Sequence, residues 1–116
     1  MADSDITKVY SISDYSGDGR QVTGWSTGTF PGPSSYTNGT GNSIDWTDLG
    51  ITASDVVTCF AQCHGTSLTA GTVPTHAAVY QKTADVWKYF DGSGVEVVNA
   101  TDMSTIFFQV YVLTAV

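Results

Sequence analysis

The final run of the chain, from Thr105 to Val116, constrains the fold more than any other stretch. It contains no glycine, no proline and no charged residue, and β-branched and aromatic side chains dominate it. As a strand it carries Phe108, Val110 and Val112 on one face, and mostly apolar residues on the other face as well. We therefore expect an interior strand, covered on both faces and paired along both edges. A buried helix is the competing interpretation, but the scarcity of helix formers argues against it.

The rest of the chain follows the same pattern. Thr, Ser, Val and Gly outnumber the strong helix formers, and 116 residues suffice for one two-layer core. We predict an all-β fold: a single-domain antiparallel β-sandwich, jelly-roll or Ig-like, with about 7–8 strands. The expected strands are 6–15, 20–30, 44–51 (a short strand and a turn), 55–64, 76–81, 86–90, 95–98 and 105–116. Residues 1–5 form a polar N-terminal arm, and residues 6–116 form the sandwich domain.

The charge balance argues against some partners. The formal net charge is −7, with only four basic residues, Lys8, Arg20, Lys82 and Lys88. So few cations cannot neutralise a phosphate backbone, and we expect no nucleic-acid partner. No apolar run reaches transmembrane length, and the N-terminus lacks a secretory apolar segment. We expect no membrane contact, and synthesis in the cytoplasm if Met1 is the native start.

The only cluster of soft metal ligands consists of Cys59, Cys63, His64 and His76. On a strand, Cys59 and Cys63 lie on one face about 13 Å apart, too far for a disulfide or a shared zinc ion. We therefore expect both thiols to pack in the core. A bulge at Ala61-Gln62 would shorten the distance and reopen the disulfide and metal alternatives.

Other chemical sites have simpler explanations. Asp14 and Asp18-Gly19 could bind calcium together with turn carbonyls, but they lack EF-hand spacing, and Asx turns account for both aspartates. Carboxylate pairs that hydrolysis would need are present as Asp45 with Asp48 and Glu96 with Asp102, but acidic residues in turns are usually solvated caps. The chain has no Gly-x-Ser-x-Gly elbow. We expect no enzymatic activity, no cofactor and no metal.

Two segments together carry a resemblance to a known family. Residues 36–51, which include Gly39-Thr40-Gly41, Ile44-Asp45 and Leu49-Gly50-Ile51, resemble a Tyr-Thr-x-Gly-Gly-x-Ser-Leu-Asp-Leu run in small virion proteins of tailed bacteriophages. Residues 86–104, with Gly94-Val95-Glu96-Val97 and Thr101-Asp102-Met103-Ser104, resemble the ending of the same proteins. This chain departs from the pattern in its longer glycine turn and in Asn99-Ala100, where a glycine is usual.

The resemblance implies a non-enzymatic virion structural protein, a capsid decoration or cement protein. Such a protein binds the outer surface of the phage capsid and bridges neighbouring major capsid proteins. It implies the major capsid protein as partner, and self-association as a dimer or trimer on the capsid. We expect the protein–protein interface to involve the N-terminal arm and the proline-containing loop. The residues are Asp3, Asp5, Ile6, Lys8, Phe30, Pro31, Pro33 and Tyr36.

Two alternatives remain open at this stage. The first is a tail or neck component of the virion. The second is a glycan-binding adhesin, because Trp25, Trp46 and Trp87 with six tyrosines invite a sugar-stacking interpretation. The adhesin predicts exposed tryptophan on one face, whereas core and interface packing is the simpler role for these rings.

Overall fold

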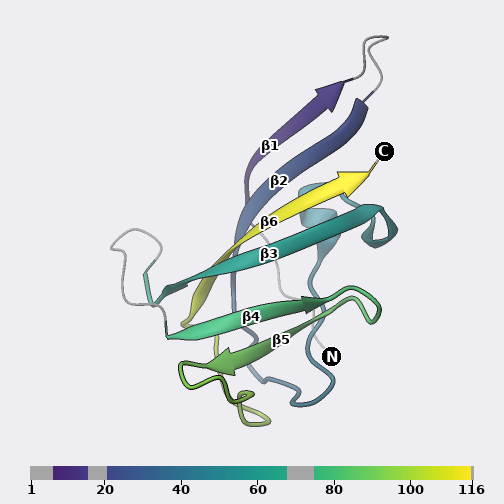
Figure 1. Cartoon of the computed structure of the whole chain (residues 1–116). Coiled ribbons are helices and arrows are strands. Elements are labelled where there is room, and N and C mark those ends of the chain that lie inside the picture. Colours follow the sequence, from purple (N-terminus) through teal and green to yellow (C-terminus); the bar gives the residue numbers. More distant parts are fainter. Residues whose placement is uncertain (1–6, 16–20, 68–74, 116) are drawn as a thin grey trace.

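The computed structural model describes residues 7–15, 21–67 and 75–115, and nearly all regular structure in them is β-strand (Figure 1). The strands are β1 (Thr7–Tyr15), β2 (Gln21–Pro31), β3 (Val56–Gly65), β4 (His76–Gln81), β5 (Val86–Asp91) and β6 (Phe107–Ala115). Two short 3-10 helices, η1 (Trp46–Leu49) and η2 (Ala53–Asp55), precede β3. Every strand pair is antiparallel. The predicted all-β antiparallel class is confirmed.

The terminal strand β6 lies inside a four-stranded sheet whose order is β1-β2-β6-β3. Trp25 of β2 lies opposite Leu113 on one edge of β6. Phe60 of β3 lies opposite Tyr111 on its other edge. The prediction that the C-terminal run is paired along both edges is therefore confirmed. The hairpin β4-β5 forms a second, two-stranded sheet beside β3 (Figure 1).

The two faces of β6 differ in burial. Phe108, Val110 and Val112 are fully buried. On the opposite face Tyr111 and Leu113 are only partly buried. The expectation that both faces are covered is therefore met in full only on the first face, where the buried cluster packs. We call the partly buried side the outer face.

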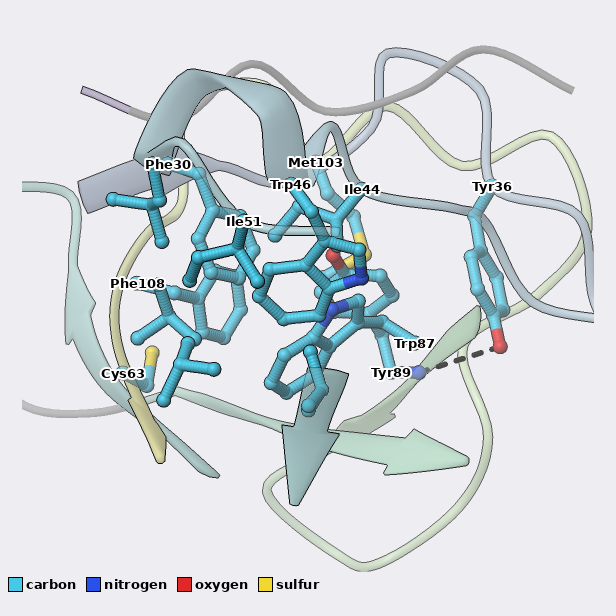
Figure 2. Close-up of a cluster of buried hydrophobic side chains, with 14 of the residues drawn as sticks. Phe30, Tyr36, Ile44, Trp46, Ile51, Cys63, Trp87, Tyr89, Met103 and Phe108 are labelled. Atoms are coloured by element: carbon cyan, nitrogen blue, oxygen red, sulfur yellow. Dashed lines mark hydrogen bonds between the residues drawn. The ribbon is translucent and has the colours of Figure 1, made fainter. Parts of the chain in front are cut away.

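An aromatic cluster joins the hairpin to the sheet (Figure 2). Phe30 of β2 stacks on Phe108 of β6, with ring centroids 5.5 Å apart. Trp87 of β5 packs 5.8 Å from Phe30, and Tyr89 packs 5.3 Å from Phe108, measured between ring centroids. Aromatic pairs at these distances add to the stability gained from area burial. The two layers are therefore held together mainly by rings from β2, β5 and β6.

Two segments that we expected to be strands are not. Within residues 44–51 the chain forms η1 (Trp46–Leu49), because the Asp45 side chain accepts from the Thr47 N–H as an N-cap and Gly50 ends the helix with φ 72°. Residues 95–98 make only an isolated bridge between Glu96 and Phe90. The described part of the chain therefore has six strands, fewer than the seven or eight predicted.

Asp85 fixes the turn between β4 and β5. Its backbone has φ 54°, a left-handed conformation that Asp and Asn tolerate better than most residues. Its carboxylate accepts from Trp46 Nε1 at 2.8 Å and from the Tyr80 hydroxyl. Burial, followed by the hydrogen bond to Asp85, raises the pKa of Tyr80 above its ordinary value. The hydrogen bond between Trp46 and Asp85 thus links the β4-β5 turn to η1.

We expect Asp85→Ala to lower the free energy of unfolding by about 2 kcal/mol, because it leaves two part-buried donors unpaired. Asp85→Asn is the matched control. It keeps an acceptor oxygen and tolerates positive φ, so its loss should stay below about 1 kcal/mol. Urea unfolding followed by tryptophan fluorescence measures both values. Equal losses for the two variants would show that the acceptor oxygen is not what stabilises the turn.

Candidate functional site

The most distinctive surface in the described residues is an aromatic group on the outer face. Trp25, Phe60, Tyr111 and Leu113 come from the three adjacent strands β2, β3 and β6, and we call them the outer patch. Trp25 is 40% exposed and Phe60 is 55% exposed. The rings of Phe60 and Tyr111 stack with centroids 4.9 Å apart and planes inclined by 20°. Contiguous apolar patches on a protein surface often mark sites of interaction with other molecules.

Polar side chains beside the outer patch are hydrogen-bonded to one another. Gln109 Nε2 donates to Thr27 Oγ1 at 3.1 Å, and Thr27 Oγ1 donates to the Val110 carbonyl at 2.8 Å. Gln109 Oε1 also lies 3.2 Å from His64 Nε2. The row crosses from β2 over β6 to β3 and satisfies polar groups without a ligand. The outer face thus presents rings beside the Gln109 amide and the Thr27 hydroxyl, which are hydrogen-bonded to each other.

The strands of the outer patch carry no charge. Strands β2, β3 and β6 contain no Asp, Glu, Lys or Arg, although the whole chain has a formal net charge of −7. The carboxylates whose side chains the structure describes lie in the 3-10 helices, in turns, at the end of β5 and after it. They are Asp45, Asp48, Asp55, Asp85, Asp91, Glu96 and Asp102. These three strands therefore carry no Asp, Glu, Lys or Arg of their own, whereas the neighbouring strand β1 contains Lys8 and Asp14.

A second constellation joins the two segments that carry the family resemblance. Tyr36 donates from its hydroxyl to Glu96 Oε2 at 2.6 Å, and the Gly39 N–H donates to the same oxygen at 2.8 Å. The Tyr89 N–H donates to the Tyr36 hydroxyl at 3.3 Å, as Figure 2 shows. Asn38 adds bonds to the Asn99 side chain and to the Val97 carbonyl. We call this arrangement the clasp.

The clasp shifts the acidity of both its titratable groups. Burial, followed by the bond to Glu96, raises the pKa of Tyr36 from 10.0 to about 12. The Tyr36 hydroxyl and the Gly39 N–H lower the pKa of Glu96 below 4.5. The folded protein therefore favours a neutral Tyr36 and an ionised Glu96, which is the state that the hydrogen bonds require.

We expect Tyr36→Phe to lower the free energy of unfolding by about 1–2 kcal/mol at pH 7, because it removes the hydroxyl that links Tyr89 and the 95–98 segment. The stability due to Tyr36 is complete below pH 10 and is lost between pH 10 and about 12, as the unfolded chain ionises first. The stability due to Glu96 is present above pH 4.5 and is lost as the pH falls through its lowered pKa.

Chemical denaturation of wild type and Tyr36→Phe from pH 3 to pH 12 measures this dependence. The gap between the two proteins should be widest near neutral pH and should narrow at both extremes. Glu96→Gln is the control, because it keeps a side-chain acceptor and removes only the acid-side titration. A gap that stays constant over the whole range would contradict the role given to these bonds.

The structure places several of the expected interface residues inside the protein. Phe30 and Tyr36 are each 1% exposed, and Pro33 is buried. The loop is held down because Tyr36 N–H donates to the Thr101 carbonyl and the Met103 N–H donates to the Pro33 carbonyl. The expectation that these three residues face a partner is therefore corrected: they belong to the core. Pro31, at the end of β2, is partly buried.

The other interface candidates lie in the N-terminal region. Lys8 falls in β1, where its backbone pairs with Gly28. Asp3, Asp5 and Ile6 lie outside the described residues. The proposed role of this arm in partner binding stays a prediction.

The cysteines behave as predicted. Cys63 belongs to the buried cluster, Cys59 packs against it, and both are free thiols. Between them β3 keeps its register against β6 without a bulge. Burial, and secondarily the charge of Asp85, raises the pKa of the Cys59 thiol to about 12. In the described residues, no group of three or more His, Cys, Asp or Glu could hold a metal ion.

The carboxylate pairs considered for hydrolysis have local partners. Asp45 caps η1, and Asp102 accepts from the backbone N–H and the hydroxyl of Ser104. The bonds from Ser104 lower the pKa of Asp102. Glu96 is engaged in the clasp. Each of these groups therefore has a structural role as a cap or anchor, while Asp14 has no described side chain and Asp18 lies outside the described residues.

Comparison with protein-family models, curated proteins and solved structures finds no match to this chain. In residues 7–15, 21–67 and 75–115, no helix has the length and apolar character needed to cross a membrane.

Sequence reasoning missed the outer patch as a site. The signal was present, because Trp25, Phe60 and Tyr111 all occur in uncharged strands. Their convergence depends on the order β2-β6-β3, which places strands together that are distant in sequence. A sequence pattern assigns each ring to a face of its own strand but does not give that order.

Proposed function

We propose that this chain is a virion structural protein that decorates the outer capsid surface of a tailed phage and bridges neighbouring major capsid proteins. The clasp is the observation that carries this proposal. The two segments that resemble phage virion proteins, residues 36–51 and 86–104, are far apart in sequence, yet they bind each other through Tyr36, Glu96 and Asn38. The resemblance therefore covers one folded unit rather than two unrelated turns.

The physical character of the molecule suits this role. A decoration protein needs a rigid body that contacts other proteins, and the two-layer core with its aromatic cluster supplies one. The described carboxylates lie outside β2, β3 and β6, and they can attract a basic capsid surface. A protein that binds only the assembled shell stabilises it by mass action, without chemistry.

The test is titration of capsids that were purified without this protein from the phage that encodes it. We expect saturable, stoichiometric binding on co-sedimentation, weaker at high salt, together with greater resistance of the shell to heat. Capsids that already carry a full complement of the protein are the matched control and should bind no more. Absence of binding to the bare shells would overturn the proposal.

A second candidate, a glycan-binding adhesin, is favoured by one observation. Trp25 is exposed on a sheet face near Phe60 and Tyr111, as the adhesin interpretation requires. Binding to cell-wall polysaccharide by the isolated protein, lost in Trp25→Ala and accompanied by no capsid binding, would establish this function in place of decoration.

A further inference from the structure

Asn38-Gly39 is the one asparagine–glycine pair in the chain, and it lies at the surface within the clasp. Asparagine is among the thermolabile residues of proteins. Its side-chain amide can be attacked by the backbone nitrogen of the next residue, and glycine has no Cβ to hinder that attack. The other two asparagines, Asn42 and Asn99, are followed by residues that carry a side chain. Asn38 is therefore the asparagine most open to this reaction.

The reaction is a spontaneous deamidation that consumes water. The Gly39 nitrogen gives up its proton and bonds to Cγ of Asn38, the Cγ–Nδ2 bond breaks, and ammonia leaves with that proton. Water then adds to one of the two carbonyls of the resulting succinimide ring, and the ring opens to aspartate or isoaspartate. Nothing is oxidised or reduced in these steps. Both residues are exposed, so water can reach the ring.

The clasp holds both nitrogens that the reaction must free. The Gly39 N–H donates to Glu96 Oε2 at 2.8 Å, and Asn38 Nδ2 donates to the Val97 carbonyl at 2.8 Å. The negative charge of Glu96 opposes loss of the Gly39 proton, because the attacking form of that nitrogen is an anion. The bond to Val97 must break before ammonia can leave. A closed clasp therefore slows the reaction at both nitrogens.

Further hydrogen bonds fix the turn that contains the pair. The Asn38 N–H donates to Asn99 Oδ1 at 3.1 Å, and the Gly41 N–H donates to the Thr37 carbonyl at 2.9 Å. Closing the five-membered ring requires rotation about backbone and side-chain bonds of Asn38. Because the clasp restricts these rotations, ring closure requires local opening of the structure.

We propose that Asn38 is a site of spontaneous deamidation that the clasp controls: the closed clasp protects it, and the product keeps the clasp open. An aspartate at position 38 has no donor for the Val97 carbonyl and brings a second carboxylate to the segment that carries Glu96. An isoaspartate adds a backbone atom inside the turn that Thr37 and Gly41 close. The modification thus makes a reversible opening permanent.

Timed incubation of the full chain at mildly alkaline pH, followed by peptide mass spectrometry, measures the rate at Asn38. The folded wild type should deamidate at least about tenfold more slowly than the same chain in urea. Glu96→Ala removes the acceptor of the Gly39 N–H, so it should deamidate at least about fivefold faster than folded wild type. The Val110 amide should still exchange slowly in this variant, which shows that the sheet is intact.

Trp87→Phe is the matched control, because it lowers global stability while its ring packs on Phe30 and Tyr80, outside the clasp. Its rate at Asn38 should stay within about twofold of wild type. A rise equal to that of Glu96→Ala would show that global unfolding exposes Asn38, and it would overturn the proposal. The proposal also fails if Asn38 reacts equally fast in the folded and the urea-unfolded chain, or in neither.

The modified protein tests the effect on the clasp. Anion exchange isolates it, because deamidation adds one negative charge to a chain of formal net charge −7. The Gly39 amide should then exchange with solvent at least about tenfold faster than in wild type, since its bond to Glu96 is lost. An unchanged Gly39 exchange rate would refute the claim that the product keeps the clasp open. Neither measurement involves the capsid, so this site and the capsid role stand or fall separately.

Discussion

Replacing Trp87 with alanine is expected to lower the free energy of unfolding by about 3–5 kcal/mol, the largest loss for any single side chain of the core. Trp87 is 0% exposed and packs against Phe30 and Tyr80, at centroid distances of 5.8 Å and 5.2 Å. Truncation leaves a cavity between the hairpin β4-β5 and the four-stranded sheet. Because a small domain has only about 5–15 kcal/mol of stability, this loss is a large fraction of it, and the midpoint of thermal unfolding should fall well below that of wild type.

The control for this prediction is Trp87→Phe. The indole Nε1 of Trp87 is buried and has no hydrogen-bond partner among the described residues. Phenylalanine removes that unpaired donor and keeps most of the ring volume, so we expect a loss below about 2 kcal/mol. Equilibrium denaturation measures both variants. If Trp87→Ala costs no more than Trp87→Phe, the ring does not hold the two layers together.

Gly41→Ala is expected to cost about 3–4 kcal/mol, although it adds only one methyl group. Gly41 has φ 81°, where an L side chain is strained by about 1–2 kcal/mol. A Cβ at this position would lie 2.6 Å from the Trp87 carbonyl oxygen, so the backbone must shift. The shift would break the paired hydrogen bonds that join Asn42 and Trp87, at 2.8 Å and 3.0 Å.

The variant Gly39→Ala separates the backbone strain of a positive φ from the steric clash of an added Cβ. Gly39 has φ 85°, but a Cβ there meets nothing within 4 Å. Its cost should therefore be the strain alone, about 1–2 kcal/mol. Thermal unfolding of the two variants side by side checks the difference. Equal destabilisation of the two variants would mean that the close approach of Gly41 to β5 does not contribute to the cost of Gly41→Ala.

The strands could be predicted because local composition determines them. The predicted strand 105–116 contains β6. The predicted strand 76–81 begins and ends at the same residues as β4, and the predicted strand 55–64 differs from β3 by one residue at each end. The prediction of a strand within residues 44–51 was wrong for a reason that is also local. Asp45 caps the 3-10 helix η1 and Gly50 ends it, and these two signals outweigh the apolar residues between them. The prediction of a strand at residues 95–98 was wrong because hydrogen bonds from the side chains of Tyr36 and Asn38 fix the path of this segment.

The candidate sites were harder to predict, because they depend on which distant residues meet. Phe30 and Tyr36 have the composition of a contact loop, but hydrogen bonds to the Pro33 carbonyl and the Thr101 carbonyl pin that loop to the core. The outer patch depends on strand order, which alternation of side chains does not specify. The capsid role comes from a resemblance and stays a proposal until binding to the shell is measured.

Amide hydrogen exchange of the native protein tests the central claim most directly, namely that the C-terminal run is the interior strand on which the core and the outer face both depend. We predict that the amides of Val110 and Val112 exchange slowest and only by global unfolding, since β6 is hydrogen-bonded to both β2 and β3. Amides of the edge strand β1 should exchange faster. If the β6 amides instead exchanged as fast as those of β1, the run would not lie at the centre of the sheet, and the account would be contradicted.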